Sequence, residues 1–301
     1  MAEVLRYAAF TDDPAAAGGN PAGVVLDASD LDGSEMQAVA AEVGYSETAF
    51  LVPAHAELGG PGTYDVRYFA PTSEVPFCGH ATIASAVALV DHGDPGPFTF
   101  RTASGDVPVL VPPSRTEGEP PTATLTSVVP QVKDLASDLV DEVLDCLGWS
   151  MADLDRSLPV RLAYAGAWHP VIPAATRQRL AELDYDFDRL LGLMQVHDWT
   201  TLQLVWREAP TRFHARDPFP PGGVVEDPAT GAAAAALGAY LVEVGVVHPP
   251  ERIQVVQGED MGRPSHLAVD VVPGDPRIRV SGQAVPIPDL RPGQTRRPES
   301  V

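Results

Sequence analysis

Carboxylates that could move a proton are the first feature to consider, and Glu47 is the leading example. It lies in the segment SETAF, residues 46–50, between Tyr45 and an apolar run at a predicted strand start. If the fold removes this side chain from water, its pKa rises and the carboxyl can both take and return a proton near neutral pH. An exposed glutamate at a strand start is the simpler interpretation, and the residues alone favour it.

Two short motifs each lead into a segment rich in small residues. Residues 76–82 read PFCGHAT and residues 226–232 read EDPATGA. A helix start offers unpaired backbone N–H groups and the positive end of the helix dipole, so it binds a carboxylate well. Two such starts facing each other across a cleft would hold a small anionic metabolite. Asp227 is also explained as a helix N-cap followed by Pro228, and the residues alone favour the cap.

The first motif also carries an imidazole and a thiol. His80 could polarise a carbonyl or share a proton with a carboxylate, although a lone histidine is more often structural. Cys78, beside a helix start, could be a base or nucleophile with a lowered pKa. It could equally pack as a small hydrophobe.

The segments after the two motifs predict helices without a polar face. Residues 79–90 read GHATIASAVALV and residues 230–244 read TGAAAAALGAYLVEV. A helix that is apolar all round is normally buried, so each is expected to run through the middle of a curved sheet. Strand-like stretches, residues 98–111 and 253–271, follow the two helices. One structural plan used twice is therefore predicted.

Residues before the two helices also correspond. The matched sets are Arg67, Phe69, Pro71 and Glu74 in the first half and Arg212, Phe213, Pro220 and Glu226 in the second. The predicted division is residues 1–118, residues 119–280, and a C-terminal segment, residues 281–301, that could return to the first domain and end in a frayed polar tail.

Apolar spacing and composition predict the remaining elements. Helices are expected at residues 31–43, 137–147 and 177–183, and strands at residues 22–26, 64–69, 107–111 and 253–256. His197, Trp199 and Trp206 are expected in strand-like surroundings as core or edge residues.

Bulk properties exclude several classes of protein. The chain has 301 residues and a formal net charge of −21, which disfavours nucleic-acid and membrane partners. The first ten residues show no secretory pattern, and no apolar run is long enough to span a bilayer. The two cysteines, Cys78 and Cys146, lack metal-ligand spacing and are too few for a disulfide framework. A reduced, cytoplasmic protein is expected.

Taken together, the motifs resemble the phenazine-biosynthesis PhzF-like family, relatives of diaminopimelate epimerase. The resemblance rests on five segments in order along the chain: residues 19–22 (GNPA), 46–50, 69–82, 226–231 and 257–265. It implies an α+β fold with two similar domains, each a β-barrel-like sheet around a central buried helix, and an active site between them. It also implies a homodimer and no metal, flavin or pyridoxal cofactor.

The resemblance further implies the site residues. Glu47 aligns with the catalytic acid/base of the family, which reverses the preference stated above. The predicted substrate-binding set is Cys78, Gly79, His80, Asp227, Thr230 and Gly231.

Two departures from the relatives are visible. Diaminopimelate epimerase has a cysteine at each helix start, whereas here Cys78 occupies the first position and Asp227 is interpreted as standing at the second. Relatives often have serine where this chain has Ala232, so any contact through that hydroxyl is missing. The sequence thus predicts a cofactor-independent isomerase of a small carboxylate, with Glu47 as proton carrier. An epimerase or racemase using Cys78 and a carboxylate, and a non-catalytic small-molecule binder, are the alternatives.

Overall fold

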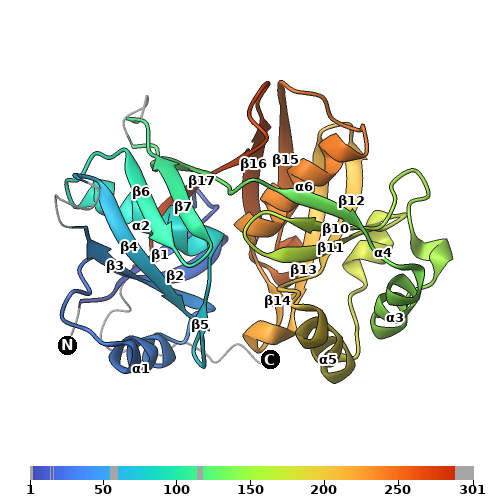
Figure 1. The fold of residues 1–301 in the computed structure, drawn as a ribbon, viewed down its shortest axis with the longest axis horizontal. Helices are drawn as coiled ribbons and strands as arrows, with labels where there is room; N and C mark the ends of the chain where they lie inside the picture. Colours follow the sequence, from blue (N-terminus) through green and yellow to red (C-terminus); the bar gives the residue numbers. More distant parts are fainter. Residues whose placement is uncertain (1–2, 14, 16, 55–59, 114–117, 289–301) are drawn as a thin grey trace.

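The computed structural model describes residues 3–13, 15, 17–54, 60–113 and 118–288. The predicted frayed tail, from residue 291 onward, lies outside the described residues. Figure 1 shows two lobes side by side, the first built by the blue-to-green part of the chain and the second mainly by the green-to-orange part.

The first half of the chain contributes eight strands and two helices in the described residues. They are β1 (Leu5–Ala9), β2 (Asn20–Val25), α1 (Gly33–Val43), β3 (Glu47–Pro53), β4 (Thr63–Phe69), β5 (Glu74–Val75), α2 (Gly79–Asp91), β6 (Phe98–Thr102), β7 (Gly105–Leu110) and β8 (Thr122–Thr126).

The second half contributes nine strands and four α-helices in the described residues, besides three short 3₁₀ turns. They are β9 (Gln131–Asp134), α3 (Ser137–Leu147), η1 (Met151–Asp153), β10 (Arg161–Tyr164), β11 (Trp168–Pro173), α4 (Arg177–Ala181), α5 (Phe187–His197), β12 (Gln203–Ala209), β13 (Arg212–Phe219), η2 (Pro220–Gly222), β14 (Val224–Asp227), α6 (Gly231–Glu243), β15 (Glu251–Gln257), η3 (Glu259–Met261), β16 (Ser265–Val271) and β17 (Ile278–Pro286).

Strand pairing repeats the same series in both halves. β1–β2 is antiparallel, β2–β3 parallel, β3–β4 antiparallel and β4–β6 parallel. In the second half, β10–β11 is antiparallel, β11–β12 parallel, β12–β13 antiparallel and β13–β15 parallel. In each series the fourth strand also pairs with a short antiparallel strand, β5 with β4 and β14 with β13. We call this pair of strands the ribbon of its half. One plan is therefore used twice, as the order of the motifs predicts.

A helix of small residues fills the centre of each half. In α2 the first eleven residues are buried on every face, and in α6 the same is true of Gly231–Leu241. α2 packs against β1, β2, β8 and β17, and α6 against β10, β16 and β17. Alanine and glycine let the surrounding strands approach closely, so each sheet curves around its helix. The predicted α+β architecture, with two barrel-like sheets around central helices, is confirmed.

β17 ties the halves together. Its first residues pair with β16, and its last residues, Ala284 to Pro286, pair with β1. It also pairs with β8, which in turn pairs with β7. The last described strand therefore contributes to both sheets, and in Figure 1 it runs from the second lobe toward the first.

Most of the elements expected from apolar spacing are present, and one helix was missed. The helices expected near residues 31–43, 137–147 and 177–183 correspond to α1, α3 and α4. The strand-like setting expected for His197 is wrong, because His197 is the last residue of α5. Asp186 caps that helix by accepting a hydrogen bond from Arg189 N, and Leu190 and Met194 form its buried face. Trp206 lies in β12. No helix in the described part of the chain is long and apolar enough to cross a membrane.

Candidate active site

Glu47 is the first residue of β3, and the fold removes it from water. The residue is 5% exposed, and the four residues after it on the strand are buried. One of its carboxylate oxygens, Oε2, is buried and has no hydrogen-bond partner among the described residues. Buried polar atoms are nearly always hydrogen-bonded, so this oxygen is unusual. A carboxylate oxygen without a partner can accept a proton.

His80 and Cys78 lie beside Glu47 at the start of α2. His80 Nε2 is 3.4 Å from Glu47 Oε2, close enough for an ion pair but not placed as a hydrogen bond. Cys78 Sγ is 3.3 Å from Nδ1 of the same ring. All three side chains are buried. The structure thus brings these three predicted site residues into one cluster.

The starts of α2 and α6 touch each other. A Cβ added to Gly79 would lie 2.8 Å from Gly231 Cα and 3.1 Å from Ala232 N, closer than real Cβ atoms approach. Only glycine allows the two backbones to come this near. The predicted pair of helix starts therefore meets at the boundary of the lobes.

Asp227 approaches the cluster from the second lobe, at the end of β14. Its Oδ2 accepts a hydrogen bond from Thr230 Oγ1 at 2.7 Å. Gln257 holds the turn between them, since its Nε2 donates to Asp227 O at 2.8 Å and its Oε1 accepts from Thr230 N at 3.0 Å. Asp227 is not the residue directly before α6; Thr230 is. The counterpart of Cys78 in the second half is therefore Thr230, which corrects the interpretation that placed Asp227 there.

Asn20 joins the two lobes, and the sequence reasoning did not select it for the site. Its Nδ2 lies 2.7 Å from Asp227 Oδ1 and 3.0 Å from His80 Nδ1. The signal for it was the motif GNPA at residues 19–22, which counted only as a mark of the family. A single buried amide thus contacts a site residue in each lobe.

Burial sets the protonation state of Glu47. Loss of solvent raises the pKa of Glu47, and the negative charge of Asp227 raises it further; hydrogen bonds from Ser46 and Cys78 act in the opposite direction but are weaker. A carboxyl with a raised pKa is suited to taking and returning a proton near neutral pH.

The neighbouring groups are also shifted by burial. The pKa of Asp227 is raised by burial against the hydrogen bonds from Thr230 and Asn20. Burial lowers the pKa of His80 to about 3, so the ring is neutral. Burial, followed by the charge of Glu47, raises the pKa of Cys78 well above its ordinary value, so the group is a thiol.

Glu47, Cys78 and His80 also carry the atom types of a metal site, and their ligand atoms all lie within 4.8 Å of one another. Zinc accepts sulfur, nitrogen and oxygen ligands in a tetrahedral arrangement. Binding needs a thiolate, whereas the surroundings of Cys78 favour the protonated thiol. In the metal-free cluster the donor set suits proton transfer.

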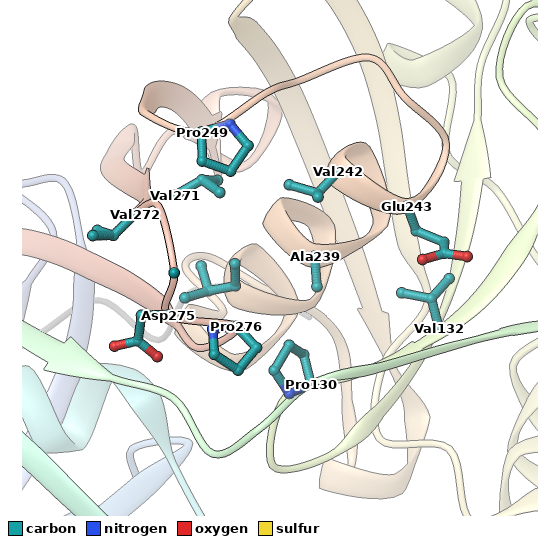
Figure 2. Close-up of a pocket in the computed structure, with 12 residues that line it drawn as sticks. Pro130, Val132, Ala239, Val242, Glu243, Pro249, Val271, Val272, Asp275 and Pro276 are labelled. Carbon is teal, nitrogen blue, oxygen red and sulfur yellow. The ribbon is translucent and has the colours of Figure 1, made fainter.

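An apolar groove of about 460 Å³ lies elsewhere, at the far end of α6. Figure 2 shows Ala239, Val242 and Glu243 on that helix facing Pro130, Val132 and the segment around Pro276. Ala239 is eight residues beyond Gly231, a distance of about 12 Å along the helix axis. The groove is therefore separate from the acid/base cluster.

Fold and site together define a class: a two-lobed α+β enzyme whose buried acid/base groups lie where two central helices meet. A model of the family described as phenazine biosynthesis-like protein matches residues 7–289. The chain belongs to this family. The chain is 31% identical to an uncharacterized isomerase, YfhB, of Bacillus subtilis, over 94% of this chain and 96% of that protein.

Two further similarities agree with this assignment. A trans-2,3-dihydro-3-hydroxyanthranilate isomerase of Pseudomonas chlororaphis is 31% identical, over 89% of this chain and 91% of its own. The crystal structure of a PhzF-family phenazine biosynthesis protein from Bacillus anthracis superposes with a TM-score of 0.81 at 27% identity, covering 95% and 96% of the two chains. The general activity of the chain is thus that of an isomerase.

Proposed function

We propose that the chain isomerises a small carboxylate-bearing metabolite by moving one proton with Glu47. The observation that carries the proposal is the buried Oε2 of Glu47, which lacks a hydrogen-bond partner among the described residues and lies beside His80 at the start of α2. A general base needs an accessible lone pair and a pKa near the working pH. Glu47 combines the two.

The substrate carboxylate would bind at the two helix starts. The first hydrogen bond within α2 runs from Thr82 N to Cys78 O, and that of α6 from Ala234 N to Thr230 O. The N–H groups before Thr82 and Ala234 are therefore not used within the helices. They offer an anion site on a protein whose net charge of −21 otherwise repels anions. Ala232 adds no hydroxyl here, so the backbone makes these contacts.

His80 and Asp227 would orient the substrate while the proton moves. Both are buried, at 2% and 4% exposure, and they lie on opposite lobes. A substrate enters when the lobes separate, and closure then removes water. Exclusion of water strengthens the few polar contacts and keeps the proton from exchanging with solvent.

The substrate is best sought among small cyclic and linear carboxylates. The relative from Pseudomonas chlororaphis is named for trans-2,3-dihydro-3-hydroxyanthranilate, so that compound is the first probe. Reaction without an added cofactor, a homodimer and a cytoplasmic location are expectations from the sequence.

An epimerase that uses Cys78 as a second base is less well supported. Its thiol lies against His80 on the same side of the site as Glu47, and its pKa is raised. Cys78→Ala tests this role: the proposal expects activity to be retained, whereas a Cys78 base requires its loss.

The test is turnover of the carboxylate panel in deuterated buffer, followed by mass spectrometry, with wild type and Glu47→Gln. Loss of the base should lower kcat by about 10³-fold, within the range of general-base contributions, while ligand binding persists. Glu74→Gln is the matched control, because Glu74 is an exposed carboxylate of the same lobe. Retained turnover in Glu47→Gln contradicts the proposal. Thermal stabilisation of wild type by a panel member that is never converted would favour the binder instead.

A further inference from the structure

Asn20 has three close polar contacts through one amide nitrogen. Nδ2 donates to Asp227 Oδ1 at 2.7 Å and to Ala229 O at 3.1 Å, and it lies 3.0 Å from His80 Nδ1. Its Oδ1 accepts a hydrogen bond from Ser46 Oγ at 3.4 Å. Asn20 is 1% exposed, so solvent does not replace these partners.

The neighbours fix which end of the amide faces His80. The carbonyl oxygen of Ala229 can only accept, and the ionised Asp227 carboxylate accepts as well, so the atom near them is the NH₂ group. Rotating the amide would place its oxygen 2.7 Å from a carboxylate oxygen. The NH₂ group therefore faces His80 Nδ1, and a donor group on this side favours the lone pair on that nitrogen. Cys78 Sγ lies 3.3 Å from the same nitrogen, and its thiol proton can also be donated to it.

The other ring nitrogen then carries the proton. His80 is neutral because burial lowers its pKa to about 3, and a neutral imidazole has one N–H. With Nδ1 as an acceptor, the N–H lies on Nε2, which is 3.4 Å from Glu47 Oε2 and 3.4 Å from Ser46 Oγ. The nitrogen beside Glu47 has no lone pair to offer.

We propose that Asn20 is a positioning residue that holds His80 in the Nε2–H form, so that a proton taken by Glu47 cannot pass to the imidazole. The role of Asn20 deepens the proposed function and rests on Glu47 being the base. The imidazole is then closed to the captured proton, which favours its return to another carbon of the substrate. Through its amide, Asn20 keeps the proton transfer within one substrate molecule.

Contacts from the second lobe hold Asn20 in place. The preceding residue, Gly19, has φ +72° and donates from its N to Pro264 O at 3.0 Å. Arg263 Nε donates to Gly19 O at 3.0 Å, and Arg263 Nη2 to Gly18 O at 3.2 Å. The motif at residues 257–265 thus clamps the turn that precedes β2. Because these contacts come from the second lobe, Asn20 is held in place when the two lobes are closed against each other.

The test is the ¹⁵N NMR spectrum of the imidazole groups in the full-length protein labelled at histidine, with the His80 signal assigned by comparison with His80→Gln. In wild type, Nδ1 should be unprotonated and Nε2 protonated from pH 6 to 8. In Asn20→Asp the NH₂ group becomes an acceptor, so the proton should appear on Nδ1. Ser46→Ala is the matched control: it removes a neighbour of both side chains but keeps the donor to Nδ1, and the wild-type pattern should persist.

A second readout uses solvent label in product. Asn20→Asp should raise deuterium uptake per turnover several-fold, because Nε2 can then take the proton from Glu47. A wild-type Nδ1–H, or an Nε2–H form that persists in both Asn20→Asp and Asn20→Ala, overturns the inference. The NMR result needs no turnover, so it stands apart from the Glu47→Gln assay. Failure of either proposal is therefore recognised separately.

Discussion

The two halves place different residues at the starts of two corresponding strands. Glu47 opens β3 opposite Ala22 of β2, and Gln203 opens β12 opposite Val171 of β11. Both strands have seven residues and both pairings are parallel. The first half thus has a carboxylate where the second has an amide.

The hydrogen bonds of the Glu47 and Gln203 side chains also differ. Glu47 Oε2 lacks a hydrogen-bond partner in the described structure. Gln203, with its amide oriented to donate, reaches both carboxylate oxygens of Asp217 at 2.7 and 2.8 Å. Asp217 also accepts from Thr201 at 3.3 Å, and Thr201 lies 2.9 Å from His169 Nδ1. In the second half the strand start therefore belongs to a hydrogen-bonded network, whereas in the first half one oxygen of the carboxylate has no partner among the described residues.

This difference favours a single proton carrier over two opposed bases. A symmetric racemase needs a base from each half. Here the second half presents Gln203 at the strand start and Thr230 at the helix start, and neither is a base at neutral pH. Its carboxylate in the site, Asp227, accepts hydrogen bonds from Thr230 Oγ1 and Asn20 Nδ2 on its two oxygens, whereas Glu47 Oε2 has no hydrogen-bond partner among the described residues.

The largest expected difference between the halves is in stability. Each half has an arginine–glutamate pair at its ribbon, and the two pairs differ in burial. Arg67 and Glu74 form an exposed pair at 2.7 Å, with each side chain 43% exposed. Arg216 and Glu226 form the counterpart, at 11% and 3% exposure. Arg216→Ala leaves a buried carboxylate without its partner and should cost about 3–5 kcal/mol. Arg67→Ala should cost about 0.2–1 kcal/mol.

Urea unfolding of the two variants measures both costs. Replacing both partners, Arg216→Met with Glu226→Leu, should recover most of the loss because no buried charge remains. Equal costs for Arg67→Ala and Arg216→Ala would show that the two ribbons are energetically alike. This pairing also corrects the sequence alignment of the halves, which matched Arg67 with Arg212 instead of Arg216.

The sequence predicted the features that depend on local pattern. The two all-apolar helices, their glycine starts and the order of strands follow from composition and spacing, and Glu47, Cys78, His80 and Asp227 do converge. Asn20 was missed because its role depends on contacts 60 and 207 residues away. α5 was missed because only two of its residues, Leu190 and Met194, are buried in a short helix. That Glu47 and Gln203 begin corresponding strands appears only from the strand pairing, which no local pattern encodes.

The second prediction, intermediate in size, concerns the stability lost when the contact between the starts of α2 and α6 is disturbed. A Cβ on Gly79 would lie 2.8 Å from backbone of the other lobe, whereas a Cβ on Gly231 would lie 3.2 Å from Gly79 Cα. Gly79→Ala must push the lobes apart and should cost about 1–3 kcal/mol, typical of overpacking, with activity falling about tenfold or more. Gly231→Ala should cost less than about 1 kcal/mol. Thermal unfolding and turnover of the two variants measure the asymmetry, and a larger loss in Gly231→Ala would reverse it.

The smallest effect concerns the pH dependence of stability. A carboxyl whose folded pKa is raised keeps its proton where the unfolded chain has lost it, so the unfolding free energy falls as pH rises between the two pKa values. Burial raises the pKa of Glu47, so wild type should lose stability above pH 5. Glu47→Gln removes this loss and should melt about 2 °C higher than wild type at pH 8, the shift expected for about 1 kcal/mol in a chain of this size.

Glu74 supplies a control of opposite sign. Arg67 lowers the pKa of Glu74, so its stabilisation is present above the ordinary carboxyl pKa and is lost as pH falls through the lowered value. Glu74→Gln should therefore melt slightly lower than wild type at pH 8 and converge with it in acid. Calorimetric scans from pH 5 to 8 compare the three proteins. A wild type and Glu47→Gln with parallel profiles would mean that Glu47 is already ionised at pH 5 in the folded state, which contradicts a pKa raised by burial.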